Sequence, residues 1–275
     1  MKINRRLFIL IVILVAILVL TACTAEPQSP GSGEPAVIAL ETTDSPVPTL
    51  EATQSPAPAA ATPDGSAAKA AFRTALTDLL ERHVLPDGTD CGADGISDPA
   101  GNQFAVYDMD GDGREELIAV YTTTYMAGQV AGVYGYDEGT GALYAELTEY
   151  PLLTFFSNGV VKAGWSHNQG LAGSFWPYTL YEYDQATDRY TPVGMVDAWE
   201  KAFSENDPSG NPFPDNVDTS GTGFVYYIMP YGEYALTQPV DAAAYEAWYT
   251  GYVGNAVEIT VPFTALTVEN IAAVQ

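Results

Sequence analysis

The stretch that decides the fold is "QFAVYDMDGDGREELIAVY", residues 103–121, in which two apolar segments enclose a short acidic loop. The apolar segments are rich in Val, Ile and Tyr, which favour strands. Between them Asp108, Asp110 and Asp112 alternate with other residues, Gly113 follows, and Glu116 comes three residues later. The pattern predicts two strands joined by a loop that crowds four carboxylates together.

This spacing is typical of a loop that binds a hard cation. If Asp108 is position 1, oxygen-bearing side chains fall at positions 1, 3, 5 and 9, and a glycine at position 6 permits a sharp turn. The carbonyl oxygen that follows the turn can be a further ligand, since calcium takes six to eight oxygens. Without a cation, carboxylates about 4 Å apart repel by roughly 4 kcal/mol at an effective dielectric near 20. We predict one structural Ca²⁺; the alternative is a solvated acidic turn. The predicted ligands are Asp108, Asp110, Asp112, the Arg114 carbonyl and Glu116.

Two known loop types can be compared with this stretch. An EF-hand or dockerin loop needs an acid at position 12, which here is Ala119, inside an apolar segment. The stretch instead resembles the calcium loop of FG-GAP repeats from integrin-like propellers, D-x-[DN]-x-D-G-x-x-D-L between two strands, with Glu116 in place of the last Asp. The resemblance covers about 15 residues and occurs once. It therefore implies the ion site and does not imply the propeller.

The rest of the folded region predicts an α+β domain at 66–275, an antiparallel β-meander packed by a few helices. Apolar residues recur at helical spacing in 66–85, and further helices are expected at 195–206, 240–249 and 268–274. Two similar hairpins 47 residues apart hint at a propeller, but recurrent hairpin chemistry explains them better. Strands are expected at 103–108, 116–125, 129–137, 142–150, 152–165 (a hairpin at Asn158-Gly159), 178–184, 189–194, 223–230 and 256–263.

The N-terminus has the layout of an export signal. Basic residues precede the apolar run 7–20, and the following "LTAC" resembles a bacterial lipobox. The resemblance implies a signal peptide at 1–22 and a lipid on Cys23, which would anchor the chain in the membrane. The alternative is an uncleaved spanning anchor, and both place the domain outside the cytoplasmic membrane. Residues 23–65 are rich in Pro, Ser, Thr and Ala and predict a disordered stalk.

Charge and cysteine content exclude several classes. Without the signal the chain keeps 7 basic and 35 acidic residues, a net charge of −28, which argues against nucleic-acid partners and direct docking on anionic lipid. With Cys23 lipidated, Cys91 has no internal disulfide partner, and its acidic neighbours do not favour a thiolate.

Active-site candidates are few. His83 ends the first predicted helix, where a cation suits the helix dipole. His167 lies in the cluster that most resembles a binding site, and the candidate ligand contacts beside it are Trp165, Trp176 and Tyr178. Core packing is the simpler role for these aromatic residues and for Trp199 and Trp248. The stretch 218–223, "DTSGTG", has the shape of a second ion loop but lacks charge. We predict no catalytic residue, although an acid pair of the glycosidase kind is not excluded by spacing alone.

These observations favour a non-enzymatic, lipid-anchored surface protein with a structural calcium site and an unidentified glycan or protein ligand. The chain is similar to exported lipoproteins of Gram-positive bacteria that carry "DxDGDGxxEL" loops, which implies location and metal rather than activity. The alternatives are an extracellular hydrolase acting on envelope polymers or glycans and a carbohydrate-binding module. Exposure of the tryptophans and the surroundings of His167 discriminate between these alternatives.

Overall fold

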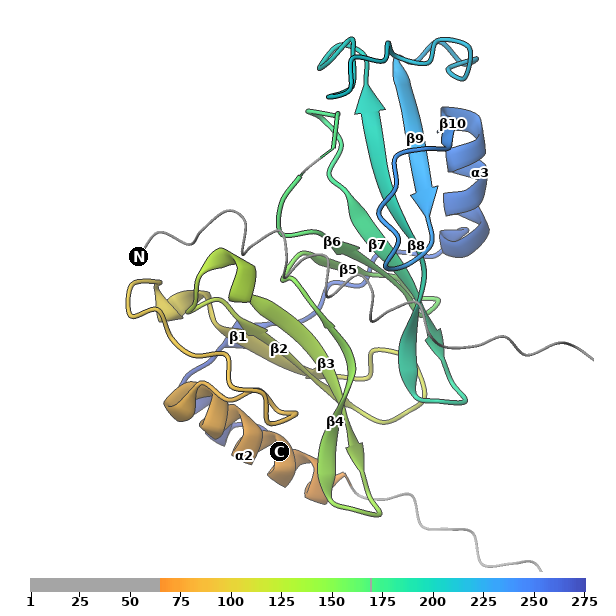
Figure 1. The fold of residues 1–275 in the computed structure, drawn as a ribbon. Helices are drawn as coiled ribbons and strands as arrows, with labels where there is room; N and C mark the ends of the chain where they lie inside the picture. The colour runs from red at the N-terminus through yellow and green to blue at the C-terminus, as the bar shows by residue number, and fades with distance from the viewer. Residues whose placement is uncertain (1–64, 169) are drawn as a thin grey trace, which may run out of the picture. The chain divides into compact units, whose positions relative to one another are not determined.

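A computed structural model describes residues 65–168 and 170–275 of the chain. In this part of the chain, antiparallel strands form two sheets with helices packed against them (Figure 1). The predicted α+β class is confirmed, with the strands divided between two sheets. None of the helices in the described residues has the length and apolar character needed to cross a bilayer. The signal at 1–22, Cys23 and the stalk up to residue 64 lie outside the described residues.

The first sheet has the strand order β11-β1-β2-β3-β4, and its neighbours are all antiparallel. Its strands are β1 (Gln103–Tyr107), β2 (Glu116–Tyr121), β3 (Val130–Asp137), β4 (Ala142–Glu149) and β11 (Thr264–Ala265). Short 3₁₀ turns precede β1 and β3, at Pro99–Gly101 and Met126–Gly128.

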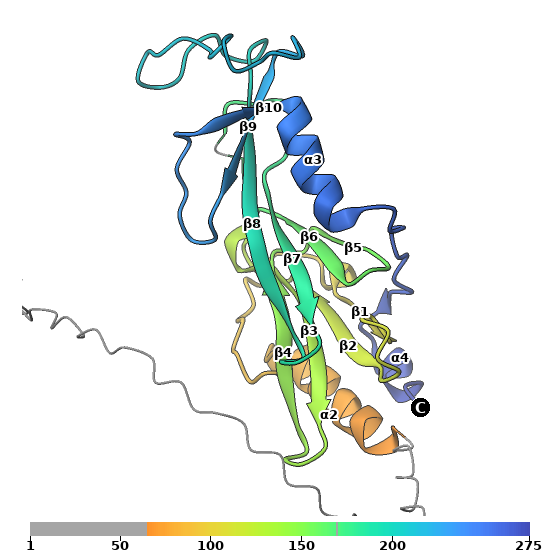
Figure 2. The same ribbon diagram turned by 90° about the vertical axis from the view of Figure 1, so that its right-hand side faces the viewer.

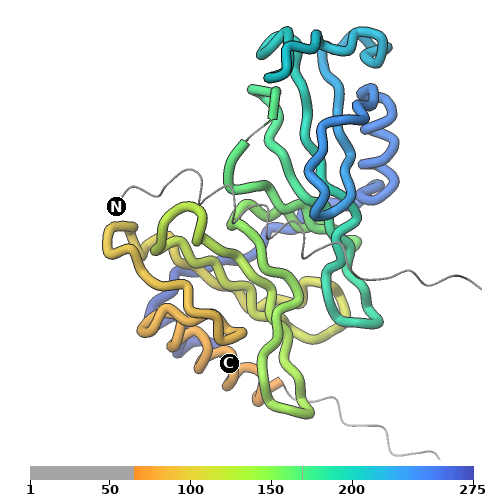
Figure 3. Tube along the Cα trace, in the orientation of Figure 1, coloured from red at the N-terminus to blue at the C-terminus, as the bar shows by residue number. Residues whose placement is uncertain are grey.

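Two helices cover the first sheet. Helix α2 (Ser66–Arg82) buries Phe72, Leu76 and Leu79 in one core cluster with residues of β1, β2 and β3. Their spacing of three and four residues gives the helix one apolar face. Helix α4 (Val268–Ala272) joins the same cluster, and the end of the chain returns to α2, where Arg73 Nη1 donates to the carbonyl oxygen of Val274 at 2.6 Å (Figure 3).

The second sheet has the order β10-β9-β8-β7-β6-β5. Its strands are β5 (Leu153–Phe155), β6 (Val160–Gly164), β7 (Tyr178–Asp184), β8 (Arg189–Glu200), β9 (Phe224–Met229) and β10 (Pro239–Asp241). Helix α3 (Ala242–Val253) lies along this sheet and packs against residues of β6, β7 and β8 (Figure 2). The hairpin predicted at Asn158-Gly159 is confirmed, and Gly159 has the positive φ of 79° that its turn requires.

A shared core joins the two sheets. Ile118 and Val133 of the first sheet lie in one buried cluster with Val161 and Tyr181 of the second. Met109, inside the acidic loop, is buried in the same cluster. The loop is therefore fixed to the junction of the sheets by an apolar side chain.

Two predicted elements are wrong. Residues 195–200 of the predicted helix 195–206 belong to β8, which pairs with β7 and β9. Both faces of this central strand are covered, so its residues form a continuous buried run that resembles a helix segment in sequence. The strand predicted at 256–263 is reduced to an isolated bridge between Glu258 and Phe156, and Pro262 has no N–H to extend it.

The two similar hairpins share turn chemistry. Asp137 Oδ1 accepts from the backbone N–H of Gly139 at 2.7 Å, and Asp184 Oδ1 accepts from that of Ala186 at 2.9 Å. Both are Asx turns, in which an aspartate caps its own turn. They belong to different sheets, which agrees with recurrent hairpin chemistry.

Candidate metal centre

The acidic loop between β1 and β2 is curled by its own aspartates. Asp108 accepts from the backbone N–H groups of Gly111 at 2.8 Å and Gly113 at 3.1 Å. Asp110 Oδ1 accepts from the N–H of Asp112 at 2.9 Å. Gly111 and Gly113 have φ of 80° and 90°, so the sharp turn predicted at Gly113 is confirmed.

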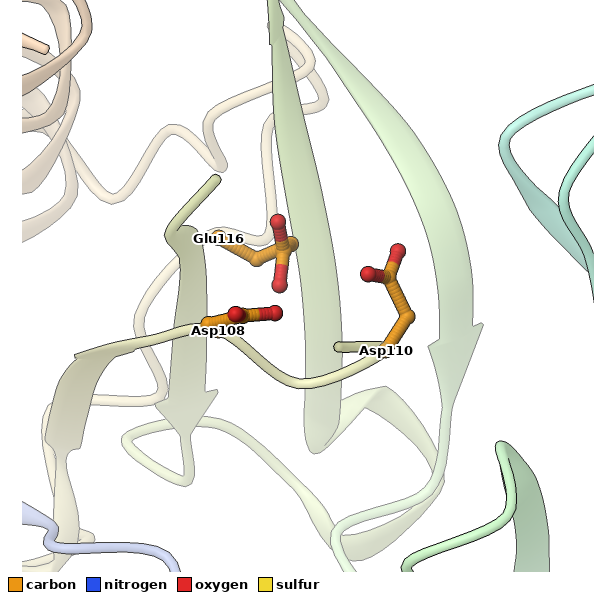
Figure 4. A group of neighbouring side chains, drawn as sticks. All are labelled: Asp108, Asp110 and Glu116. Atoms are coloured by element: carbon orange, nitrogen blue, oxygen red, sulfur yellow. The ribbon is translucent and has the colours of Figure 1, made fainter. Parts of the chain in front are cut away.

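Three of the predicted ligands come together. Carboxylate oxygens of Asp108, Asp110 and Glu116 lie within 4.8 Å of one another, and Figure 4 shows the three side chains gathered along the loop. Asp108 follows the end of β1 and Glu116 begins β2, so pairing of these strands brings the two acids close. This group, the loop triad, has the separation that a shared cation requires.

Burial makes the loop triad electrostatically unusual. Glu116 is only 4% exposed, and its Oε2 accepts from the N–H of Met109 at 2.6 Å. Burial, with nearby carboxylates as a smaller cause, raises the pKa of Glu116 to about 9. Burial also raises the pKa of Asp110, and its Oδ2 is buried with no hydrogen-bond partner. Without a cation, the fold suppresses the charge on these groups.

Asp112 and Arg114 belong to a second group. Arg114 pairs through its guanidinium with Asp112 at 2.6 Å and with Asp188 at 2.9 Å, and oxygens of Asp110, Asp112 and Asp188 also lie within 4.8 Å of one another. The predicted ligand Asp112 therefore already faces a positive charge that the chain supplies. The predicted role of the Arg114 carbonyl oxygen as a ligand stays a prediction.

Sequence reasoning missed Asp188. It lies in the β7–β8 turn in the left-handed region, with φ of 55°, and accepts hydrogen bonds from the hydroxyls of Tyr144 and Tyr183. These hydrogen bonds and the Arg114 charge lower its pKa despite a burial effect in the opposite direction. In the sequence Asp188 is recognisable only as an acid in a hairpin turn, and such acids are common on protein surfaces.

Glu146 was also missed. It lies in β4, is 5% exposed, and its Oε2 is buried without a hydrogen-bond partner. Burial raises its pKa to about 8, and the acids Asp188 and Asp110 are near enough to add to the effect. In the sequence Glu146 is marked only as an acid with apolar neighbours on both sides, Ala145 and Leu147.

The aromatic candidates occupy different environments. Trp176 is 47% exposed, and its Nε1 donates to the carbonyl oxygen of Trp165 at 2.8 Å. Trp165 is half-buried, and its Nε1 donates to Thr179 Oγ1 at 3.1 Å. Tyr178 is fully buried in β7 and bonds to the hydroxyl of Tyr245, so the proposed ligand contact there does not reach the surface. His167 is exposed, and its Nδ1 lies 2.8 Å from the hydroxyl of its neighbour Ser166.

In the second candidate ion loop, at 218–223, backbone N–H and hydroxyl groups of the chain donate hydrogen bonds to the aspartates. Asp218 accepts from the N–H groups of Thr222 at 3.0 Å and Gly223 at 2.8 Å. Asp241 accepts from the hydroxyls of Thr219 at 2.8 Å and Ser220 at 2.7 Å. These donors lower the pKa of both aspartates. They stabilise the ionised carboxylates, so that no cation is needed for that purpose.

The remaining reactive groups have structural roles. His83 ends α2, and its Nδ1 lies 2.9 Å from the hydroxyl of Tyr121. Burial raises the pKa of Cys91 to about 11, which disfavours the nucleophilic thiolate. Trp199 is buried, and Trp248 is partly buried against the core of the second sheet.

The chemistry that this arrangement supports best is cation binding. The loop triad offers three carboxylates, whereas the neighbouring group of Asp110, Asp112 and Asp188 already holds the Arg114 guanidinium.

No protein-family model matches this chain, and neither the curated proteins nor the solved structures contain a match to it.

Proposed function

We propose that this chain is an exported, lipid-anchored surface protein whose folded domain is stabilised by one calcium ion in the loop triad. The observation that carries the proposal is the convergence of Asp108, Asp110 and Glu116 within 4.8 Å. Among the described residues, no ion pair reaches any of these three carboxylates. Three carboxylates without a counter-charge are stable together only if they bind protons or a cation.

The donors favour calcium over other metals. They are carboxylate oxygens on a curled loop, which suit hard cations, and no His or Cys joins them in the described residues. Calcium accepts irregular geometry, whereas magnesium demands a near-ideal octahedron. Outside the cell calcium is abundant, so that even a weak site with a Kd of about 10⁻⁴–10⁻³ M would be filled.

The ion would join several parts of the fold. Asp108 and Glu116 tie β1 to β2, and the same loop carries Arg114 to Asp188 in the second sheet. A cation that orders the loop therefore also holds Arg114 in place for this contact. The metal would act as a structural element at the junction of the sheets.

The anchor and the ligand extend the proposal beyond the described residues. The lipobox motif supports a lipid on Cys23 and a location on the outer face of the membrane, and uptake of a labelled palmitate analogue that is lost in Cys23→Ser tests this. A non-enzymatic binding role fits best, since the strongest site is a structural one. A glycan is the alternative ligand that one observation favours, namely the exposed Trp176 ring held through its Nε1.

Direct titration tests the calcium site. Calorimetry on the full chain in detergent should show one calcium per chain, and Asp110→Ala should weaken binding at least tenfold because it removes one of three charged ligands. Glu246→Gln, at an exposed acid on α3, is the matched control and should bind like the wild type. No saturable heat with the wild type, or equal binding by both variants, would exclude the proposed site.

A further inference from the structure

A cavity of about 260 Å³ lies beside the acidic loop. It is bordered by the start of α2, by the second half of the loop and by β3 and β4; Glu116 of the loop triad is part of its walls, whereas Asp108 and Asp110 are not. The lining residues that matter here are Ala68, Lys69, Gly135, Tyr136, Tyr144 and Glu146.

The basic side chains around this cavity have ion-pair partners, whereas some of its acidic side chains have none. Lys69 pairs with Glu115 at 2.9 Å, and Arg114 is held by Asp112 and Asp188. Glu146 has no ion pair among the described residues. The positive groups of the walls are thus already engaged, and two buried carboxyl groups remain without an ion pair: Glu116, which belongs to the loop triad, and Glu146.

Glu146 is built into the wall of the cavity. A side chain at Gly135 would come within 2.5 Å of Glu146 Oε1 and within 2.4 Å of the Tyr144 hydroxyl, so glycine at this position lets both groups lie over β3. Glu146 Oε2 is buried and has no hydrogen-bond partner. Buried polar groups normally have hydrogen-bond partners, so a carboxyl group with none, whose Oε1 lies beside Gly135 in the cavity wall, indicates a missing donor.

We propose that this cavity binds a small primary amine, whose ammonium group donates hydrogen bonds to Glu146. An ammonium has three donors and one positive charge, which matches a buried carboxylate without a partner. Tyr136 and Tyr144 are partly exposed, line the same cavity and provide apolar contacts for the carbon chain of the amine.

A second metal ion fits this place less well. Glu146 belongs to neither of the two groups of acids whose oxygens are close enough to hold an ion. Calcium needs six to eight oxygens, whereas an ammonium is satisfied by three acceptors. The proposal goes beyond the calcium site and does not depend on it.

Titration with 1,4-diaminobutane tests the proposal, with 1,4-butanediol as a neutral analogue of similar shape. The full chain in detergent, saturated with calcium, should bind the diamine at least tenfold more tightly than the diol, because the ammonium donates a charge-assisted hydrogen bond to Glu146 and the hydroxyl donates only a neutral one. Equal affinity for the two compounds would contradict the proposal. Repeating the titration at higher salt separates site binding from general attraction by the acidic chain, since only the latter is strongly screened.

Variants assign the interaction to Glu146. Glu146→Gln should weaken diamine binding about tenfold or more, while Glu138→Gln, at an exposed acid of the same cavity, should bind nearly as the wild type does. Ala68→Leu, which narrows the cavity from the α2 side, should also weaken binding and leaves Glu146 intact. If Glu138→Gln weakens binding as much as Glu146→Gln does, the diamine binds to general negative charge and the proposal is overturned. Calcium titration of Glu146→Gln keeps the two proposals separate, because the loop triad is unchanged in that variant.

Discussion

Calcium is expected to raise the midpoint of thermal unfolding of the full chain by roughly 5–10 °C, and a chelator should reverse the rise. A ligand that binds only the folded state stabilises it by about 2.7 kcal/mol at a hundredfold excess over Kd. For a domain of this size 1 kcal/mol shifts the midpoint by about 2–4 °C. The physical cause is the loop triad, whose buried acids resist ionisation until a cation joins them.

Asp110→Ala should reduce this calcium-dependent shift to about half or less, because binding at least tenfold weaker leaves about 1.4 kcal/mol or less of stabilisation at the same calcium concentration. Asp110 contributes to the loop triad, and its buried Oδ2 has no hydrogen-bond partner. Differential scanning calorimetry with calcium and with chelator measures both midpoints, and Glu246→Gln should keep the wild-type shift. A wild-type midpoint that does not respond to calcium would contradict a structural role for the ion.

The calcium-free protein should lose stability as pH rises from about 5 to about 8. Burial raises the pKa of Glu116 from 4.5 to about 9 and that of Glu146 from 4.5 to about 8. Between these limits the folded chain holds protons that the unfolded chain has released, so the free energy of unfolding falls with pH. Each group contributes at most about 1.4 kcal/mol per pH unit. The pKa of Asp188 is lowered, so its contribution is lost at acidic pH, below this window.

Calcium should remove much of this loss, because a bound cation stabilises the ionised form of Glu116. Glu116→Gln should make the pH profile of the calcium-free protein less steep, since a neutral amide replaces one of the two carboxyl groups whose pKa the fold raises. The same variant should lose its response to calcium. Urea unfolding at pH 5, 6.5 and 8, with and without calcium, gives the free energies. A calcium-free wild type whose stability is constant or rises over this range would refute the electrostatic interpretation.

Local features of the fold followed well from the sequence. The glycine turn at Gly113, the hairpin at Asn158-Gly159 and the apolar face of α2 each depend on residues close in the chain. The helix expected at 195–206 failed because pairing with β7 and β9 decides the conformation of β8, and local propensity is weaker than such pairing. The same limit hid the division of the strands between two sheets.

The same distinction applies to the candidate site: residues close in the sequence could be predicted, and residues brought together only by the fold could not. Asp108, Asp110 and Glu116 could be grouped in advance because they lie within nine residues of the chain and the loop geometry is local. Asp188 lies 74 residues from Arg114 in the chain, and its contact arises only from the meeting of two sheets. Glu146 comes from a third segment, and its importance follows from burial rather than from its neighbours in sequence. Arg114 was predicted to act through its carbonyl oxygen, whereas its guanidinium proves to bind two aspartates.

The most direct test of the central claim is anomalous X-ray diffraction from crystals of the protein grown with calcium. The account predicts one anomalous peak enclosed by carboxylate oxygens of Asp108, Asp110 and Glu116, at the 2.3–2.6 Å distances typical of calcium. It also predicts that the Arg114 guanidinium remains between Asp112 and Asp188. No peak at the loop triad, or a peak among Asp110, Asp112 and Asp188 with Arg114 displaced, would contradict it.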